Sequence, residues 1–249
     1  MSYTDHNCYF FPRETHDYYF CDRSVSDEAI IYCHGGSFRY GDKGDNNDYL
    51  TALAEKTSMQ VYSVGYRNID EARSLKTMID DIVEIISLIV DRSAIKHFHI
   101  MGASSGAYLA WIMSIMISNP EKFGISSKFT IDSVTLISGY FLFKRNDPIT
   151  QMLCLFPAFQ DFPKSIKDVE MDYSGYDLPP ILLITGEADG CKEDSEALFN
   201  AVKATNTTEI ELSVSSSDTD MADHCFIIER PDTDVSNKTF ERIYTFINR

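Results

Sequence analysis

Basic residues are scarce in this sequence. Of its 249 residues, 22 are Lys or Arg and 38 are Asp or Glu, which gives a formal net charge of −16 at pH 7. A negative field of this size repels nucleic acid and anionic membrane surfaces. We therefore expect neither as a partner, and neutral or cationic small molecules are favoured over polyanions.

Long apolar runs are also missing. No run approaches the ~20 residues of a membrane-spanning helix, and the polar start, MSYTDHN, lacks the basic-then-apolar pattern of a signal peptide. There is no C-x-x-C motif, and a chain of this length does not depend on disulfides. We expect reduced thiols and a cytoplasmic protein, with a secreted protein that has lost its signal as the alternative. The six cysteines are Cys8, Cys21, Cys33, Cys154, Cys191 and Cys225.

Internal repeats, low-complexity tracts and long linkers are absent too. What is present is a composition that is 44% hydrophobic, with 16 Phe and 14 Tyr. Such a chain can bury one sizeable core and is unlike a disordered one. We expect a single domain over residues 1–249.

Strand-like and helix-like patterns alternate along the chain. Strands are expected at 28–33, 59–65, 95–101, 129–137, 180–186 and 208–214, with one or two edge strands within 8–23. Helices are expected at 48–56 with Asn47 as cap, at 75–90, over 109–116, at 195–203 and at 238–247. This alternation predicts an α/β fold with a mostly parallel central sheet and helices on both faces. Residues 140–178, which include MLCLFPAF, are irregular and are interpreted as a short lid-like insertion.

The motif G-x-S-x-G occupies Gly102–Gly106, between the strand at 95–101 and the following helix. In this motif a serine sits on a sharp, strained strand-to-helix turn with its hydroxyl exposed. The neighbouring positions must be small because strand and helix nearly touch there, and here all of them are small. The helix N-terminus also offers unpaired N–H groups to a developing anion. Ser104 is thus a candidate nucleophile, and an ordinary glycine-rich turn is the competing interpretation.

Three further polar positions follow predicted strands. The segment His34-Gly-Gly-Ser37 follows the strand at 28–33, Asp189 follows the strand at 180–186, and His224 lies beyond the last strand. Functional groups of such folds gather at the C-terminal ends of the strands. Asp189 is preferred among the acids because it follows a buried strand directly. Its rivals are Asp194, Asp218, Asp220 and Asp223.

The order Ser, Asp, His, with G-x-S-x-G and an upstream HGG loop, resembles the α/β-hydrolase superfamily. The similarity is greatest to small carboxylesterases of the hormone-sensitive-lipase-like and feruloyl- or acetyl-esterase-like groups, and includes the segment Val64-Gly-Tyr-Arg67. Two positions depart from the pattern: Ser37 replaces the third glycine of HGGG, and Ala103 replaces the acidic residue common before the serine. Only 27 residues precede Glu28, so a large N-terminal cap is not expected.

The resemblance implies an α/β-hydrolase fold and a catalytic triad. Ser104 would be the nucleophile, His224 would accept its proton, and Asp189 would orient the imidazole. No cofactor or metal is expected. Backbone N–H groups would form the oxyanion hole, supplied by Gly36, Ser37 and Ser105. Gly36 and its neighbour Gly35 would let the backbone approach the substrate without a Cβ clash.

The predicted function is hydrolysis of short-acyl carboxylic esters, because the missing cap and the short insertion leave few residues to wall an acyl tunnel. The expected partner is a small-molecule ester. An amidase or arylformamidase with the same triad and a non-catalytic binding protein on the same fold are the alternatives.

His34 is expected to stabilise its loop. His97 and His99 alternate on one strand and are expected to have a packed or surface role rather than to bind a metal.

Overall fold

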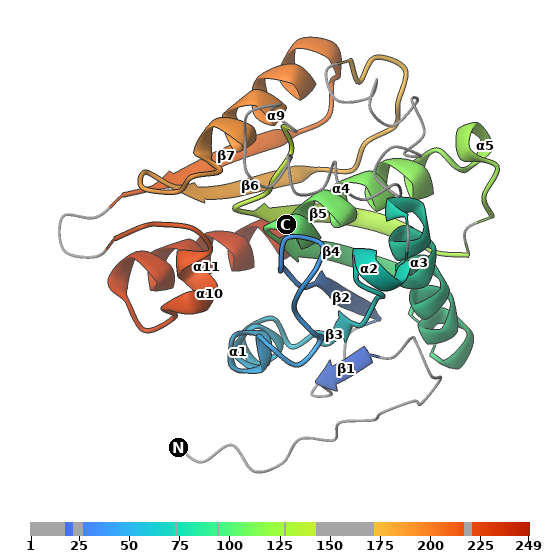
Figure 1. Ribbon diagram of the computed structural model, residues 1–249, viewed down its shortest axis with the longest axis horizontal. Helices are drawn as coiled ribbons and strands as arrows, with labels where there is room; N and C mark the ends of the chain where they lie inside the picture. Colours follow the sequence, from blue (N-terminus) through green and yellow to red (C-terminus); the bar gives the residue numbers. More distant parts are fainter. Residues whose placement is uncertain are drawn as a thin grey trace.

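The computed structural model describes residues 18–21, 27–72, 74–93, 95–126, 128–142, 172–216 and 221–249. The strands of this part form one sheet in the order β1-β3-β2-β4-β5-β6-β7 (Figure 1). β1 (Tyr18–Cys21) pairs antiparallel with β3, and every other pairing is parallel. The parallel strands are β2 (Glu28–Cys33), β3 (Gln60–Val64), β4 (His97–Ala103), β5 (Thr130–Ile137), β6 (Ile181–Gly186) and β7 (Ile210–Ser215).

The central strands are apolar almost without interruption. β2 is buried from Ala29 to Cys33 and β6 over its whole length. Strands with helices on both faces have no solvent side, so their sequence does not alternate. This is why the predicted strand at 28–33 coincides with β2, and why the strand at 180–186 differs from β6 by one residue.

Helices cover both faces of the sheet (Figure 1). They are α1 (Asn47–Thr57), α2 (Ile69–Ala72), α3 (Leu75–Arg92), α4 (Ser105–Ser118), α5 (Pro120–Phe123), α9 (Lys192–Thr205), α10 (Phe226–Glu229) and α11 (Asp234–Ile247). One core cluster joins the sheet to α3, α4 and α9, and a second joins the opposite face to α1, α10 and α11. The predicted α/β architecture is confirmed. Within the described ranges no helix is long and apolar enough to cross a bilayer.

Helix α4 is the most buried helix. Every residue from Ser105 to Ile117 is buried, and Trp111 packs edge-on against Tyr173 with ring centroids 5.4 Å apart. A helix that is apolar on all sides belongs inside a protein. α4 is therefore held firmly between the sheet and α3, and its N-terminal end is a fixed point of the structure.

Three helix starts differ from the prediction. Asn47 lies inside α1 rather than capping it, and Asn46 at the cap position makes no capping bond because its side chain accepts a hydrogen bond from the Tyr32 hydroxyl (2.9 Å). α9 begins at Lys192, three residues earlier than predicted. α11 begins at Asp234, where Thr233 accepts the capping bond from the Ser236 N–H. The short helices α2, α5 and α10 were not predicted.

Some predictions lie outside the described residues. Of the lid-like segment 140–178, the structure describes 140–142 and 172–178, so the MLCLFPAF patch is not covered. Only 18–21 of the predicted edge-strand region is described as strand. The single domain over 1–249 remains a prediction.

A buried ion pair ties the segment after β3 to α3. Asp81, whose side chain is 2% exposed, accepts hydrogen bonds from the Arg67 Nε at 2.8 Å, its Nη2 at 2.5 Å and its backbone N–H at 3.1 Å. A bidentate guanidinium–carboxylate pair is among the stronger polar contacts in proteins. It fixes the position of Tyr66, the residue before Arg67, which contacts the HGG loop.

We expect Arg67→Ala to lower the free energy of unfolding by about 3 kcal/mol, because it removes the cation from the buried Asp81 carboxylate. The lower end of the range is used because the Arg67 side chain is itself 30% exposed. Urea denaturation measures the change. The control is Lys76→Ala, which breaks an exposed pair with Asp80 and should change stability by less than about 0.5 kcal/mol. Equal losses in the two variants would contradict the structural role of the buried pair.

Candidate active site

Ser104 lies at the turn between β4 and α4, with φ 53° and ψ −121°. Few residues other than glycine adopt such a positive φ, and residues held there cluster at functional sites. The Ser104 N–H donates to the Ile137 carbonyl of β5 (2.8 Å), which locks the turn to the sheet. A Cβ on Gly106 would lie 2.1–2.2 Å from the carbonyl oxygens of His34 and Cys33. Only glycine therefore lets α4 start this close to the end of β2.

The structure brings Ser104, His224 and Asp189 together. The His224 Nε2 lies 2.9 Å from the Ser104 Oγ, and its Nδ1 lies 3.0 Å from the Asp189 Oδ1. If the Nδ1–H donates to the carboxylate, the Nε2 lone pair is free to accept the serine proton. Ser104 directly follows β4, Asp189 lies in the loop after β6, and His224 lies just before α10, so the three side chains come from segments far apart in the sequence.

Asp189 is held as a carboxylate. Its side chain is fully buried; Oδ2 accepts from the Thr185 hydroxyl and Oδ1 from the Cys191 N–H, both at 2.9 Å. Burial acts to raise its pKa, but the hydrogen bonds from His224, Ser138 and Cys191 outweigh burial and hold the pKa below its ordinary value. Asp189 is therefore negatively charged at neutral pH.

The Asp189 carboxylate in turn raises the pKa of His224 above its ordinary value, because its hydrogen bond stabilises the imidazolium. The thiols of Cys191 and Cys225 add to this effect, and burial opposes it. The His224 side chain is 44% exposed, so it is reachable from solvent while Asp189 is not.

The rival acids are engaged elsewhere or not described. Asp194 accepts the backbone N–H groups of Phe141 (2.9 Å) and Leu142 (2.6 Å), and so anchors the segment after β5. Asp223 pairs with Arg230. Asp218 and Asp220 lie outside the described residues.

The HGG loop faces the same serine. Gly36, with φ +125°, and Ser37, with φ 53°, line a cavity of about 480 Å³ that Ser104 and His224 also line. Within the described part of the chain, the N–H groups of Gly36 and Ser37 donate no hydrogen bond, so both are free for a ligand. Ser105 is the first residue of α4, where the N–H has no intrahelical acceptor. Its side chain is buried and does not line the cavity.

His34 braces this loop and does not touch the serine. Its buried ring stacks on Tyr66, with centroids 4.2 Å apart, and the Tyr66 hydroxyl donates to the His34 carbonyl at 2.5 Å. Burial lowers the pKa of His34, which keeps the ring neutral. The His97 Nδ1 lies 3.0 Å from the Asp132 Oδ2, and the His99 Nδ1 lies 2.8 Å from the Ser133 Oγ.

Sequence reasoning missed three groups around His224. Ser138, buried at φ 49°, accepts the Cys225 N–H at 2.9 Å and so orients the chain that carries His224. Cys191 lies beside the imidazole and Cys225 lines the cavity, and neither was assigned a role at the site from the sequence. Ser138 was recognisable only as a polar residue directly after a buried strand.

We expect Asp189→Asn to lower the pKa of His224 toward the ordinary value of about 6.5, because the imidazolium loses its carboxylate. An NMR pH titration of the imidazole measures this. A raised folded-state pKa stabilises the protein fully below about pH 6.5, and that contribution is lost as the pH rises through the folded-state pKa. The stability difference between wild type and variant should therefore be larger near pH 6 than in alkaline solution.

Asp194→Asn is the matched control, because it removes a buried carboxylate that does not bond His224. The His224 pKa should be unchanged in it. A shift in Asp194→Asn without one in Asp189→Asn would overturn the choice of acid.

Comparison with protein families matches residues 30–227 to the α/β-hydrolase-fold family. No curated protein gives a significant match. Among solved structures, esterase B from Lactobacillus rhamnosis is 23% identical with a TM-score of 0.79, covering 94% of this chain and 80% of its own. Esterase LipW from Mycobacterium marinum is 18% identical with a TM-score of 0.76, covering 92% and 76%. An esterase from Pyrobaculum calidifontis is 19% identical with a TM-score of 0.70, covering 92% and 78%.

These structures share the fold of the chain described above. The family match is the stronger finding, because it runs from β2 through the serine turn and Asp189 to α10 and so spans most of the chain. The resemblance inferred from the Ser–Asp–His order and the HGG loop is confirmed at this level, and the chain belongs to the α/β-hydrolase-fold family.

Proposed function

We propose that this protein is a serine hydrolase that cleaves carboxylic esters, with Ser104 as nucleophile. The observation that carries the proposal is the hydrogen-bonded series from the Ser104 Oγ through both ring nitrogens of His224 to a buried, ionised Asp189. Solved structures with this fold are named as esterases, and one esterase B structure is inhibited by a tributyrin phosphonate. The names of these relatives support ester hydrolysis over the other reactions open to such a triad.

In the first half-reaction the Ser104 hydroxyl attacks the ester carbonyl. A serine hydroxyl is a weak nucleophile at neutral pH, so a base must take its proton as the bond to carbon forms. The His224 Nε2 is within reach at 2.9 Å. Asp189 keeps the other ring nitrogen protonated and stabilises the imidazolium. His224 then gives the proton to the leaving alcohol, which leaves an acyl-enzyme on Ser104.

The negative oxygen of the tetrahedral intermediate needs donors that are already in place. Gly36 and Ser37, whose N–H groups are free, line the cavity beside Ser104 and would supply two donors, and the N–H of Ser105 at the start of α4 would supply a third. Donors fixed in a rigid backbone stabilise the developing charge without reorganising, and losing one typically costs about 3 kcal/mol of transition-state stabilisation.

The second half-reaction repeats the first with water as nucleophile. His224 takes a proton from water, hydroxide attacks the acyl carbon, and the proton returns to the Ser104 Oγ as the acid is released. The half-exposed position of His224 lets water reach it, whereas Asp189 stays dry.

The preferred acyl group is short. Backbone and small or polar side chains make up much of the described cavity wall around Ser104, including Gly35, Gly36, Ser37 and Ala103. Apolar ligands gain free energy only where apolar side chains receive them. Such a wall offers little apolar surface to a long acyl chain.

We expect Ser104→Ala to abolish labelling by a fluorophosphonate probe and to reduce ester hydrolysis by at least about a thousandfold, because no nucleophile remains. Ser105→Ala is the matched control, since its hydroxyl is buried beneath the turn and its backbone N–H is retained. Circular dichroism checks that both variants fold. Labelling that survives in Ser104→Ala and disappears in Ser105→Ala would identify the wrong serine.

We expect kcat/KM for nitrophenyl esters to peak between acetate and butyrate and then to fall. Each CH₂ that entered an apolar pocket would gain ~0.8 kcal/mol, about a fourfold increase in kcat/KM. A chain that stays in water gains nothing. A steady rise to octanoate would contradict the short-acyl preference, and a matching series of nitroanilides tests whether amides are cleaved at all.

A further inference from the structure

The cavity at Ser104 has neighbours. A second hollow of about 360 Å³ shares Asp45, Asn46 and Glu229 with it, and a third of about 420 Å³ shares Asp48 and Tyr49 with the second. Hollows with common wall residues adjoin, so the three lie in a row along the seam between the start of α1 and the segment from α10 to α11. We call the second and third hollows together the acidic trough.

The trough carries charge of one sign. Asp45 and Asp48 stand on the α1 side, and Glu229 and Asp232 stand on the opposite side. Across the described wall residues of all three hollows there is no Lys or Arg. Carboxylates gathered along one cleft focus a negative potential there and raise the local concentration of cations.

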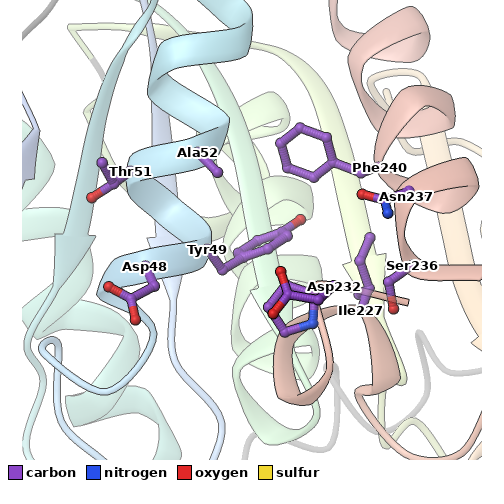
Figure 2. A pocket seen from close by; sticks show the side chains of 10 residues that line it. Asp48, Tyr49, Thr51, Ala52, Ile227, Asp232, Ser236, Asn237 and Phe240 are labelled. Carbon is purple, nitrogen blue, oxygen red and sulfur yellow. The ribbon is translucent and has the colours of Figure 1, made fainter. Parts of the chain in front are cut away.

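A buried, unpartnered hydroxyl belongs to a residue in the wall of the third hollow. Tyr49 is 3% exposed, and its hydroxyl has no hydrogen-bond partner. Figure 2 shows its ring projecting from α1 toward α11, where it meets Phe240 edge-on with centroids 5.8 Å apart. An unsatisfied buried hydroxyl is unfavourable, and a ligand that bonds it removes that penalty. Burial also raises the pKa of Tyr49, so the group there is a neutral phenol.

The size and chemistry of the third hollow suit an organic cation better than a bare metal ion. Its volume of about 420 Å³ is that of a small-molecule pocket. Ile227, Ala52 and Phe240 offer apolar surface beside the two carboxylates Asp48 and Asp232. Aromatic rings next to carboxylates attract alkyl ammonium groups through cation–π and Coulomb interactions together.

We propose that the acidic trough binds the far end of the ester substrate, and that this end is an alkyl ammonium group. The inference rests on the proposed ester hydrolysis at Ser104, because the trough adjoins the cavity of that serine. The ammonium group would lie in the third hollow, between the side chains of Asp48 and Asp232 and beside Tyr49. The substrate class is therefore an ester with a cationic tail, and because the preferred acyl group is short, we expect the alcohol part to carry the tail.

The test compares pairs of esters that differ only in charge. One member ends in trimethylammonium and the other in the neutral tert-butyl group of the same shape, on spacers of graded length. One series places the tail on the acyl part and another on the alcohol part, which identifies the part that enters the trough. We expect kcat/KM for the cationic member to exceed that of its neutral partner by about tenfold at the best spacer length. The ratio should fall at high salt, since ionic screening weakens the attraction.

Variants locate the effect. Asp48→Asn with Asp232→Asn should bring the cationic-to-neutral ratio close to unity and leave kcat/KM for the neutral ester unchanged, and Tyr49→Phe should lower the ratio while keeping the ring. The matched control is Asp27→Asn, which should leave the ratio unchanged. Asp27 is an exposed carboxylate just before β2, at the end of the strands opposite to the serine. Asp48 lies in the first turn of α1, so thermal unfolding of each variant checks that the fold is retained.

The outcomes separate this inference from the proposed function. Hydrolysis of neutral esters without a cationic preference, or a preference that the double variant retains, would overturn the trough and leave esterase activity intact. If no ester is cleaved, the proposed function fails, and calorimetric titration with butyltrimethylammonium then decides the site. Binding that Asp48→Asn with Asp232→Asn abolishes would support the trough, and no binding by the wild type would overturn it.

Discussion

The contact between the start of α4 and the end of β2 is the constraint on which the site depends. Gly106 lets the helix backbone approach the carbonyls of Cys33 and His34 more closely than any side chain would allow. That approach forces Ser104 into a conformation rare for a non-glycine residue and turns its hydroxyl to the cavity. It also brings the start of the HGG loop beside the serine. The complete burial of α4 holds this arrangement against the strain at the turn.

A second series of contacts supports the loop from outside the site. Asp81 on α3 holds Arg67, and Tyr66 beside it stacks on His34 and donates to the His34 carbonyl. None of these residues lines the serine cavity, and they act on the site only by supporting the HGG loop. The position of the Gly36 N–H therefore depends on this buried ion pair outside the site. Rigid support of this kind is what lets backbone N–H groups act on a developing charge without reorganising.

Charge is distributed unevenly around the serine. Asp189 is buried and fully hydrogen-bonded, so its charge acts locally on His224. The carboxylates of the acidic trough are exposed and act on whatever enters from solvent. The whole chain carries a net charge of −16. The carboxylates of the trough come together because α1 lies next to the segment before α11 (Figure 1).

The sequence by itself determined the sheet and the order of the residues on its edge. Buried parallel strands leave continuous apolar runs, so β2 was predicted to the residue and β6 to within one. Polar residues that directly follow such runs mark the carboxyl ends of the strands, and this pattern predicted Ser104 and Asp189 as site residues. In the structure, His224 is hydrogen-bonded to both of them. Their catalytic roles remain predictions.

Only the tertiary structure decided which distant side chains meet. Asn46 fails to cap α1 because Tyr32 takes its side chain, Ser138 contacts the backbone at Cys225, and the trough pairs residues 45–48 with 229–232. Periodicity and turn signals are local, and they carry no record of such contacts. Contacts across some 180 residues follow from how the helices pack on the two faces of the sheet.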